Sequence, residues 1–139
     1  MTVPVIFVSH GGYAEGVRDA VEMILGEQDR VGTVSLPPNG STEEVSAGVT
    51  AALDRLGATG GEALVLADLM GGSPANAVGA LALANPALQL VSGLNLPMVL
   101  EVLTSTESTA AGLAAVAAAA GREGVLDVGA QLRAALHKG

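Results

Sequence analysis

The sequence holds 139 residues, half of them hydrophobic and 14% charged, so it predicts one globular domain over residues 1–139 and excludes a disordered chain. Its net charge of −8, with Phe7 and Tyr13 as its two aromatic residues, excludes a nucleic-acid binder, because phosphates would be repelled and bases would have little to stack on. The absence of cysteine excludes disulfides and thiol chemistry, and an acidic surface suits a basic protein partner.

The N-terminal segment MTVPVIFVSHGG is typical of a strand and not of a signal peptide, because no basic residue precedes its apolar run and polar residues close it early. No apolar run reaches the roughly 18 residues that span a bilayer. The sequence therefore predicts a soluble cytoplasmic protein.

In chain order, short β-branched runs alternate with segments whose apolar residues recur at helical spacing. We predict strands at 3–9, 31–36, 62–68 and 88–93, and helices at 14–25, 41–56, 73–84, 96–103 and 105–121. Ser41 and Glu44 form a capping box, and Ser73 with Pro74 predicts a serine N-cap followed by proline at the first helical position. Near the C-terminus, GVLDV (124–128) predicts a weak fifth strand, followed by a helix at 130–138.

Strand–helix alternation repeated four times predicts an α/β fold, in which a parallel four-stranded sheet carries helices on both faces, linked by right-handed crossovers. In such sheets, ligands and chemistry gather at the carboxyl ends of the strands. Polar and glycine residues follow three of the predicted strands. They are Ser9, His10, Gly11 and Gly12 after the first, Asp68, Gly71, Gly72 and Ser73 after the third, and Ser92, Gly93 and Asn95 after the fourth.

His10 is the strongest candidate for a reactive group. A lone histidine is more often structural, but this one ends a strand, precedes two glycines and has an aspartate at the end of a strand expected beside it. Asp68 alone is equally well explained as a turn residue, Ser73 as a helix cap, and Tyr13 as a half-buried helix-start residue. The GGSP segment also offers backbone amides and a hydroxyl to an anion. His137, in the charged tail, is interpreted as a helix-terminal cation.

Several other sites are excluded by spacing. Gly11 and Gly16 match the glycines of a phosphate-binding loop, but Val17 stands where the loop needs lysine. The GGSPA segment lacks the final glycine of a hydrolase nucleophile elbow. No second histidine lies at a spacing that would hold a metal, so we expect neither a metal site nor a cofactor.

Four motifs in order, SHGGYAEGV, LADLMGGSPANA, SGLNLPMVLE and GREGV, resemble the enzyme IIA component of the mannose-type phosphoenolpyruvate:sugar phosphotransferase system (PTS). The likeness spans roughly the whole chain. The residues that fit the two longer motifs are Asp68, Gly71, Gly72, Ser73, Pro74 and Asn76, then Gly93, Asn95, Pro97 and Met98.

The resemblance implies a phosphotransferase in which the residue matching His10 accepts a phosphoryl group from HPr and passes it to a IIB domain. It also implies a homodimer in which a C-terminal strand, here GVLDV, is exchanged between subunits. Members often carry IIB on the same chain, so the sequence is either a free-standing IIA subunit or an excised domain. The related phosphotransferase subunit of the dihydroxyacetone kinase system lacks the Gly-Gly-Ser-Pro run. The presence of this run here therefore favours the sugar-transport branch.

A mechanism follows from these residue types. Asp68 would hold a proton on Nδ1 of His10, leaving Nε2 bare to carry the phosphoryl group. Gly11, Gly71, Gly72 and Ser73 would receive the phosphoryl oxygens, and Gly11 and Gly12 would let the phosphohistidine of a partner approach. Two alternatives stay open: a regulatory phosphohistidine domain, and an α/β module that binds an anion without chemistry. The sequence names no sugar.

Overall fold

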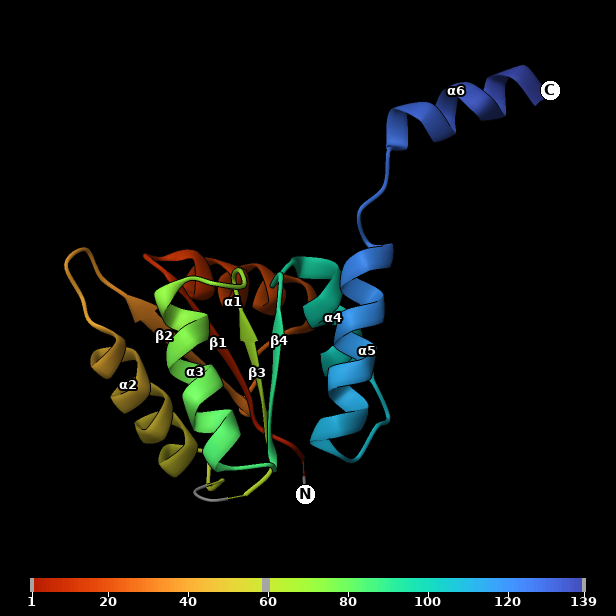
Figure 1. Cartoon of the computed structure of the whole chain (residues 1–139). Helices are drawn as coiled ribbons and strands as arrows, with labels where there is room; N and C mark the ends of the chain where they lie inside the picture. Colours follow the sequence, from red (N-terminus) through yellow and green to blue (C-terminus); the bar gives the residue numbers. More distant parts are fainter. Residues whose placement is uncertain (1, 59–60, 139) are drawn as a thin grey trace.

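Four parallel strands form a sheet in the order β2-β1-β3-β4, as the strand–helix alternation predicts (Figure 1). The computed structural model describes residues 2–58 and 61–138. The strands are β1 (Val5–His10), β2 (Val31–Leu36), β3 (Ala63–Ala67) and β4 (Leu88–Ser92). The helices are α1 (Tyr13–Leu25), α2 (Thr42–Arg55), α3 (Ser73–Ala84), α4 (Leu96–Thr104), α5 (Ala110–Glu123) and α6 (Val128–Lys138).

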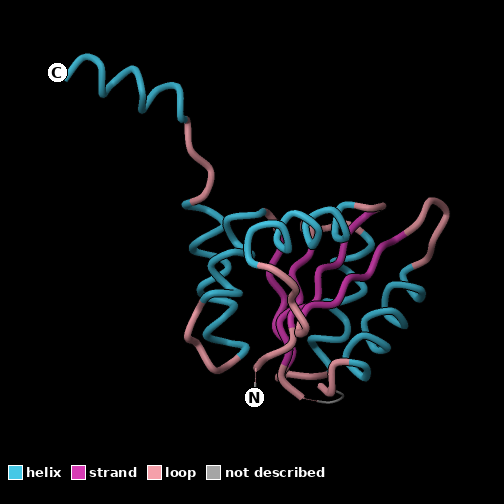
Figure 2. Tube along the Cα trace, turned by 180° about the vertical axis from the view of Figure 1, so that it is seen from behind, coloured by secondary structure: helices cyan, strands magenta, loops and turns pink. Residues whose placement is uncertain are grey.

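The buried side chains divide into two clusters, one on each face of the sheet. Because successive side chains of a strand point to opposite faces, Val5 and Phe7 of β1 pack with α1, α4 and α5, whereas Ile6 and Val8 pack with α2 and α3. The two views from opposite sides show these layers (Figures 1 and 2). The core is aliphatic apart from Phe7, as the composition requires.

Local signals set most helix starts. The Ser41 Oγ accepts a hydrogen bond from the Glu44 N–H (3.2 Å), which confirms Ser41 as the N-cap of α2. The fifth helix begins at Ala110 and not at 105, because the Thr109 Oγ1 accepts from the Gly112 N–H (3.0 Å) and makes Thr109 the N-cap. A second acceptor supports this start, since the Ala110 N–H donates to a Glu62 carboxylate oxygen at 2.7 Å.

The predicted fifth strand at 124–128 is wrong. Gly124 caps α5, and α6 already begins at Val128. Asp127 explains the difference, because its side chain accepts from the Ala130 N–H (2.9 Å) and its carbonyl accepts from the Gln131 N–H (3.2 Å), as an N-cap does. No exchanged strand is seen in the described chain, because its C-terminus is helical.

The last helix extends away from the rest of the molecule (Figure 1). None of its residues is buried, although apolar side chains recur along it and along the segment before it. These exposed residues are Val125, Leu126, Val128, Leu132 and Leu136. Within the described ranges, no helix combines the length and the hydropathy needed to cross a bilayer.

Candidate functional site

The register of β1 and β3 places His10 and Asp68 at the same edge of the sheet. Val8 pairs with Ala67, and the Asp68 N–H continues the ladder by donating to the Val8 carbonyl at 3.0 Å. The residues that follow each strand therefore meet at the carboxyl edge, where ligands of parallel sheets bind. The expectation that β3 lies beside β1 is confirmed.

The Asp68 carboxylate contacts His10 at two points. One oxygen, Oδ2, lies 2.7 Å from the imidazole Nδ1 and accepts the His10 backbone N–H at 2.9 Å, while Oδ1 accepts the Leu69 N–H at 2.9 Å. The Asp68 side chain is only 12% exposed, whereas that of His10 is 49% exposed. The acid is thus held in place by two backbone N–H groups and by its contact with Nδ1, and the ring that it orients faces solvent at the rim.

The pKa of the Asp68 carboxyl reflects opposing influences. Partial burial acts to raise this pKa, but hydrogen bonds from the His10 N–H, the imidazole and the Leu69 N–H, together with the charge of His10, outweigh it and lower the pKa below its ordinary value. Asp68 is therefore ionised at neutral pH and accepts hydrogen bonds on both oxygens.

A buried serine shapes the turn that presents His10. Ser9 is fully buried, and its Oγ accepts the Ala14 N–H at 2.7 Å in the first turn of α1. Gly11 adopts φ +50° and donates its N–H to the Leu36 carbonyl at 2.9 Å. The sequence predicts Ser9 only as a residue of the rim, and the one signal for this contact is a serine at the end of a buried strand, five residues before a helical N–H.

Tyr13 ties this turn to the next loop of the rim. Its hydroxyl donates to the Leu94 carbonyl at 2.6 Å, which joins the start of α1 to the segment between β4 and α4. This contact gives the tyrosine a clear structural role, consistent with its interpretation as a half-buried residue at a helix start.

The loop between β3 and α3 lies against the ring. Gly71 adopts φ +87°, and Gly72, not Ser73, is the N-cap of α3. The predicted capping role of Ser73 is thus wrong: Ser73 is the first helical residue, with Pro74 second, and its exposed hydroxyl has no hydrogen-bond partner among the described residues. Nor do the described residues supply an acceptor for the N–H groups of Gly72 and Ser73.

Asn95 does not join the site. Its Oδ1 accepts the Met98 N–H at 2.9 Å and caps α4, while its Nδ2 donates to the Gly121 carbonyl of α5 at 3.0 Å. The expected convergence of β4 residues on His10 therefore fails for Asn95, whose side chain instead caps α4 and binds α5. Ser92 is exposed at the end of β4 and makes no hydrogen bond to His10.

The rim combines one oriented imidazole with few charges. Among residues 2–58 and 61–138, no group of three potential ligands is placed to hold a metal ion, and Asp68 forms an ion pair with His10. Two apolar side chains flank the pair in the same loop, Leu69 at 50% and Met70 at 82% exposure. This arrangement supports nucleophilic chemistry at Nε2 and the approach of another protein.

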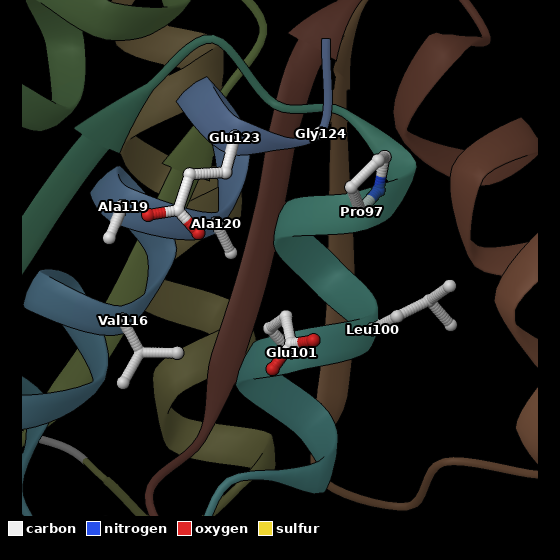
Figure 3. Close-up of a pocket in the computed structure, with 8 residues that line it drawn as sticks. All are labelled: Pro97, Leu100, Glu101, Val116, Ala119, Ala120, Glu123 and Gly124. Carbon is white, nitrogen blue, oxygen red and sulfur yellow. The ribbon is translucent and has the colours of Figure 1, made fainter. Parts of the chain in front are cut away.

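An apolar groove of about 600 Å³ lies elsewhere, between α4 and α5 (Figure 3). Its lining includes Pro97, Val116, Ala119 and Ala120, together with Glu101 of α4 and Glu123 of α5 (Figure 3). It contains none of the predicted site residues.

Comparisons with known proteins agree with these features. The EIIA-man family model, described as "PTS system fructose IIA component", matches residues 4–120. The chain is similar to the PTS system mannose-specific EIIAB component of Escherichia coli K12, at 35% identity over 90% of the chain and 39% of that protein, so it spans about two fifths of that relative's length.

Two further relatives resemble the chain over most of their own length. The PTS system sorbose-specific EIIA component of Klebsiella pneumoniae is 34% identical over 78% of each chain. The structure of a mannose/sorbose-specific IIA subunit from Enterococcus faecalis superposes with a TM-score of 0.82, at 33% identity, over 91% of this chain and 94% of that one.

Proposed function

This chain belongs to the EIIA-man family of phosphotransferase-system IIA components, and from that premise we propose that His10 accepts a phosphoryl group from HPr and passes it to a IIB domain or subunit. The observation that carries the proposal is the 2.7 Å contact between Nδ1 of the exposed His10 ring and the ionised Asp68. The proposal takes residues 1–139 as one EIIA domain acting in the cytoplasm.

Transfer requires a bare ring nitrogen and a fixed proton. With Nδ1–H donating to Asp68, the lone pair of Nε2 attacks the phosphorus of the HPr phosphohistidine. The new Nε2–P bond forms as the P–N bond of HPr breaks, and the proton stays on Nδ1 throughout. The carboxylate stabilises the positive charge that develops on the imidazole, and the same steps in reverse deliver the phosphoryl group to IIB.

The phosphoryl oxygens need donors near Nε2. The start of α3 supplies the unpaired N–H groups of Gly72 and Ser73 and the free Ser73 hydroxyl, and a helix N-terminus favours an anion. Gly11 and Gly71 shape the two loops on either side, and Gly12 leaves room for the donor protein. This set contains no arginine or lysine, which suits a relay, since a phosphoryl group held too tightly would not be passed on.

A Ser73→Ala variant is expected to slow phosphoryl transfer about tenfold, which corresponds to one hydrogen bond of about 1.5 kcal/mol to a charged group. Because Ser73 is not the N-cap, the free energy of unfolding should change by less than about 0.5 kcal/mol. Rapid-quench kinetics and urea unfolding measure both quantities, with the exposed Ser108→Ala as the control. An unchanged rate would remove the hydroxyl from the phosphoryl site.

The proposal is tested by incubating the chain with phosphoenolpyruvate, enzyme I and HPr and then adding a IIB protein. One acid-labile, base-stable phosphoryl group should appear on His10 and disappear when IIB is added. A label that forms but is not passed to IIB would favour a regulatory phosphohistidine domain, such as the relatives in the dihydroxyacetone kinase system. Absence of the label would favour an anion-binding α/β module.

The exposed C-terminal segment, residues 125–138 with α6, supports a homodimer as part of this proposal. Its apolar side chains and the basic Arg133 and Lys138 complement a groove of apolar residues flanked by Glu101 and Glu123, which a second copy would supply. Sedimentation should detect a dimer that Leu132→Glu converts to a monomer, while Leu83→Glu, also exposed, leaves it intact. A monomeric wild-type chain would overturn the dimer proposal.

A further inference from the structure

Gly72 lies against the reactive ring and leaves no room for a side chain. A Cβ atom at this position would be 2.8 Å from Cε1 of His10, 3.4 Å from Nε2 and 3.3 Å from a methyl carbon of Leu69. The backbone does not explain the glycine, because its φ of −83° and ψ of 165° are open to any residue. The ring itself is what excludes a larger residue.

The preceding glycine, Gly71, is required for a different reason, which is its backbone conformation. Gly71 has φ +87°, which residues with a Cβ rarely adopt, yet a Cβ there would meet no atom within 4 Å. The first glycine of the pair therefore permits the turn, and the second permits contact between the α3 N-terminus and the imidazole.

A single hydrogen bond at Nδ1 does not fix the orientation of the imidazole, because the ring can still rotate about that contact. Asp68 fixes Nδ1, while the Gly72 backbone lies beside the opposite part of the ring, at Cε1 and Nε2. Asp68 is itself held by the His10 and Leu69 backbone N–H groups, so it would not follow a displaced ring. Because the ring is half exposed, an added methyl group would push it toward solvent and away from the carboxylate.

We propose that Gly72 is a positioning residue. Because it has no side chain, the His10 imidazole can lie against its backbone, with Nδ1 in contact with Asp68 and Nε2 facing the start of α3. This packing of the His10 ring against Gly72 is a property of the unphosphorylated chain, and only its effect on phosphoryl transfer rests on the proposed function. A Gly72→Ala change keeps the backbone N–H, so it separates this role from any hydrogen bond that the same residue makes to a phosphoryl oxygen.

The test compares Gly72→Ala with Gly79→Ala, a glycine of the same helix where a Cβ would meet nothing within 4 Å. In ¹⁵N-labelled protein, imidazole shifts should show one tautomer with the proton on Nδ1 in wild type and Gly79→Ala, and a mixture in Gly72→Ala. Single-turnover transfer from phospho-HPr should be about a hundredfold slower in Gly72→Ala, since small misplacements of reacting groups cost this much, and unchanged in Gly79→Ala.

The outcomes separate the two levels of the proposal. Wild-type imidazole shifts and a wild-type transfer rate in Gly72→Ala would overturn the positioning role of Gly72. Failure of wild type to take up phosphoryl would count against the proposed function alone, because the tautomer readout needs no donor. If Gly72→Ala does not fold, the test uses wild type. A nuclear Overhauser contact between the Gly72 α-protons and the His10 Hε1 supports the packing of the ring against Gly72, and its absence overturns the proposal.

Discussion

A His10→Ala variant is expected to take up no phosphoryl group from phosphoenolpyruvate, enzyme I and HPr, a fall of at least about a thousandfold, because the attacking nitrogen is gone. The fold should survive, since the ring is half exposed and the His10 backbone N–H still reaches Asp68. We expect the free energy of unfolding to change by less than about 1 kcal/mol. Intact-protein mass spectrometry and urea unfolding measure the two effects.

The chain contains its own control for this experiment. His137 is the other histidine and lies on the exposed α6, so His137→Ala should take up the phosphoryl group like wild type. Phosphorylation that persists in His10→Ala and disappears in His137→Ala would transfer the reactive role to the C-terminal helix.

The parts of the fold that the sequence predicts are those fixed by local chemistry. The apolar runs of β1 and β3 and the cap at Ser41 act over a few residues, so their positions follow from the sequence. The placement of His10 beside Asp68 also follows, because neighbouring parallel strands end at one edge.

The errors concern which residue caps a helix and which elements a side chain connects. Ser73 has the composition of an N-cap, yet the extended backbone of Gly72 ends the loop one residue earlier and takes that position. Asp127 lies within a β-branched segment but caps α6. Asn95 follows a strand that ends at the rim, but its amide spans α4 and α5. For Ser73 and Asp127 the choice of capping residue within a short segment decides, and for Asn95 a contact with a distant helix decides.

Replacing Asp68 by asparagine should slow transfer about a hundredfold, because an amide cannot accept three N–H groups. With its oxygen toward His10, the NH₂ group faces the Leu69 N–H; with its NH₂ toward His10, two donors meet at the backbone. In the second orientation the NH₂ donates to Nδ1, so the ring proton moves to Nε2 and blocks the attacking nitrogen. Rapid-quench kinetics and imidazole ¹⁵N shifts measure the rate and the tautomer.

The same variant tests the electrostatics of the pair through pH. Folding lowers the pKa of Asp68, so the stability that this carboxylate contributes is fully present above its unfolded pKa of about 3.9 and is lost as the pH falls through the folded pKa. The difference in unfolding free energy between wild type and Asp68→Asn should therefore shrink as the pH falls below about 4. The exposed Asp29→Asn is the control for loss of a carboxylate outside the site. A difference that does not vary with pH, together with an unchanged transfer rate, would show that Asp68 neither holds its charge through His10 nor orients the ring.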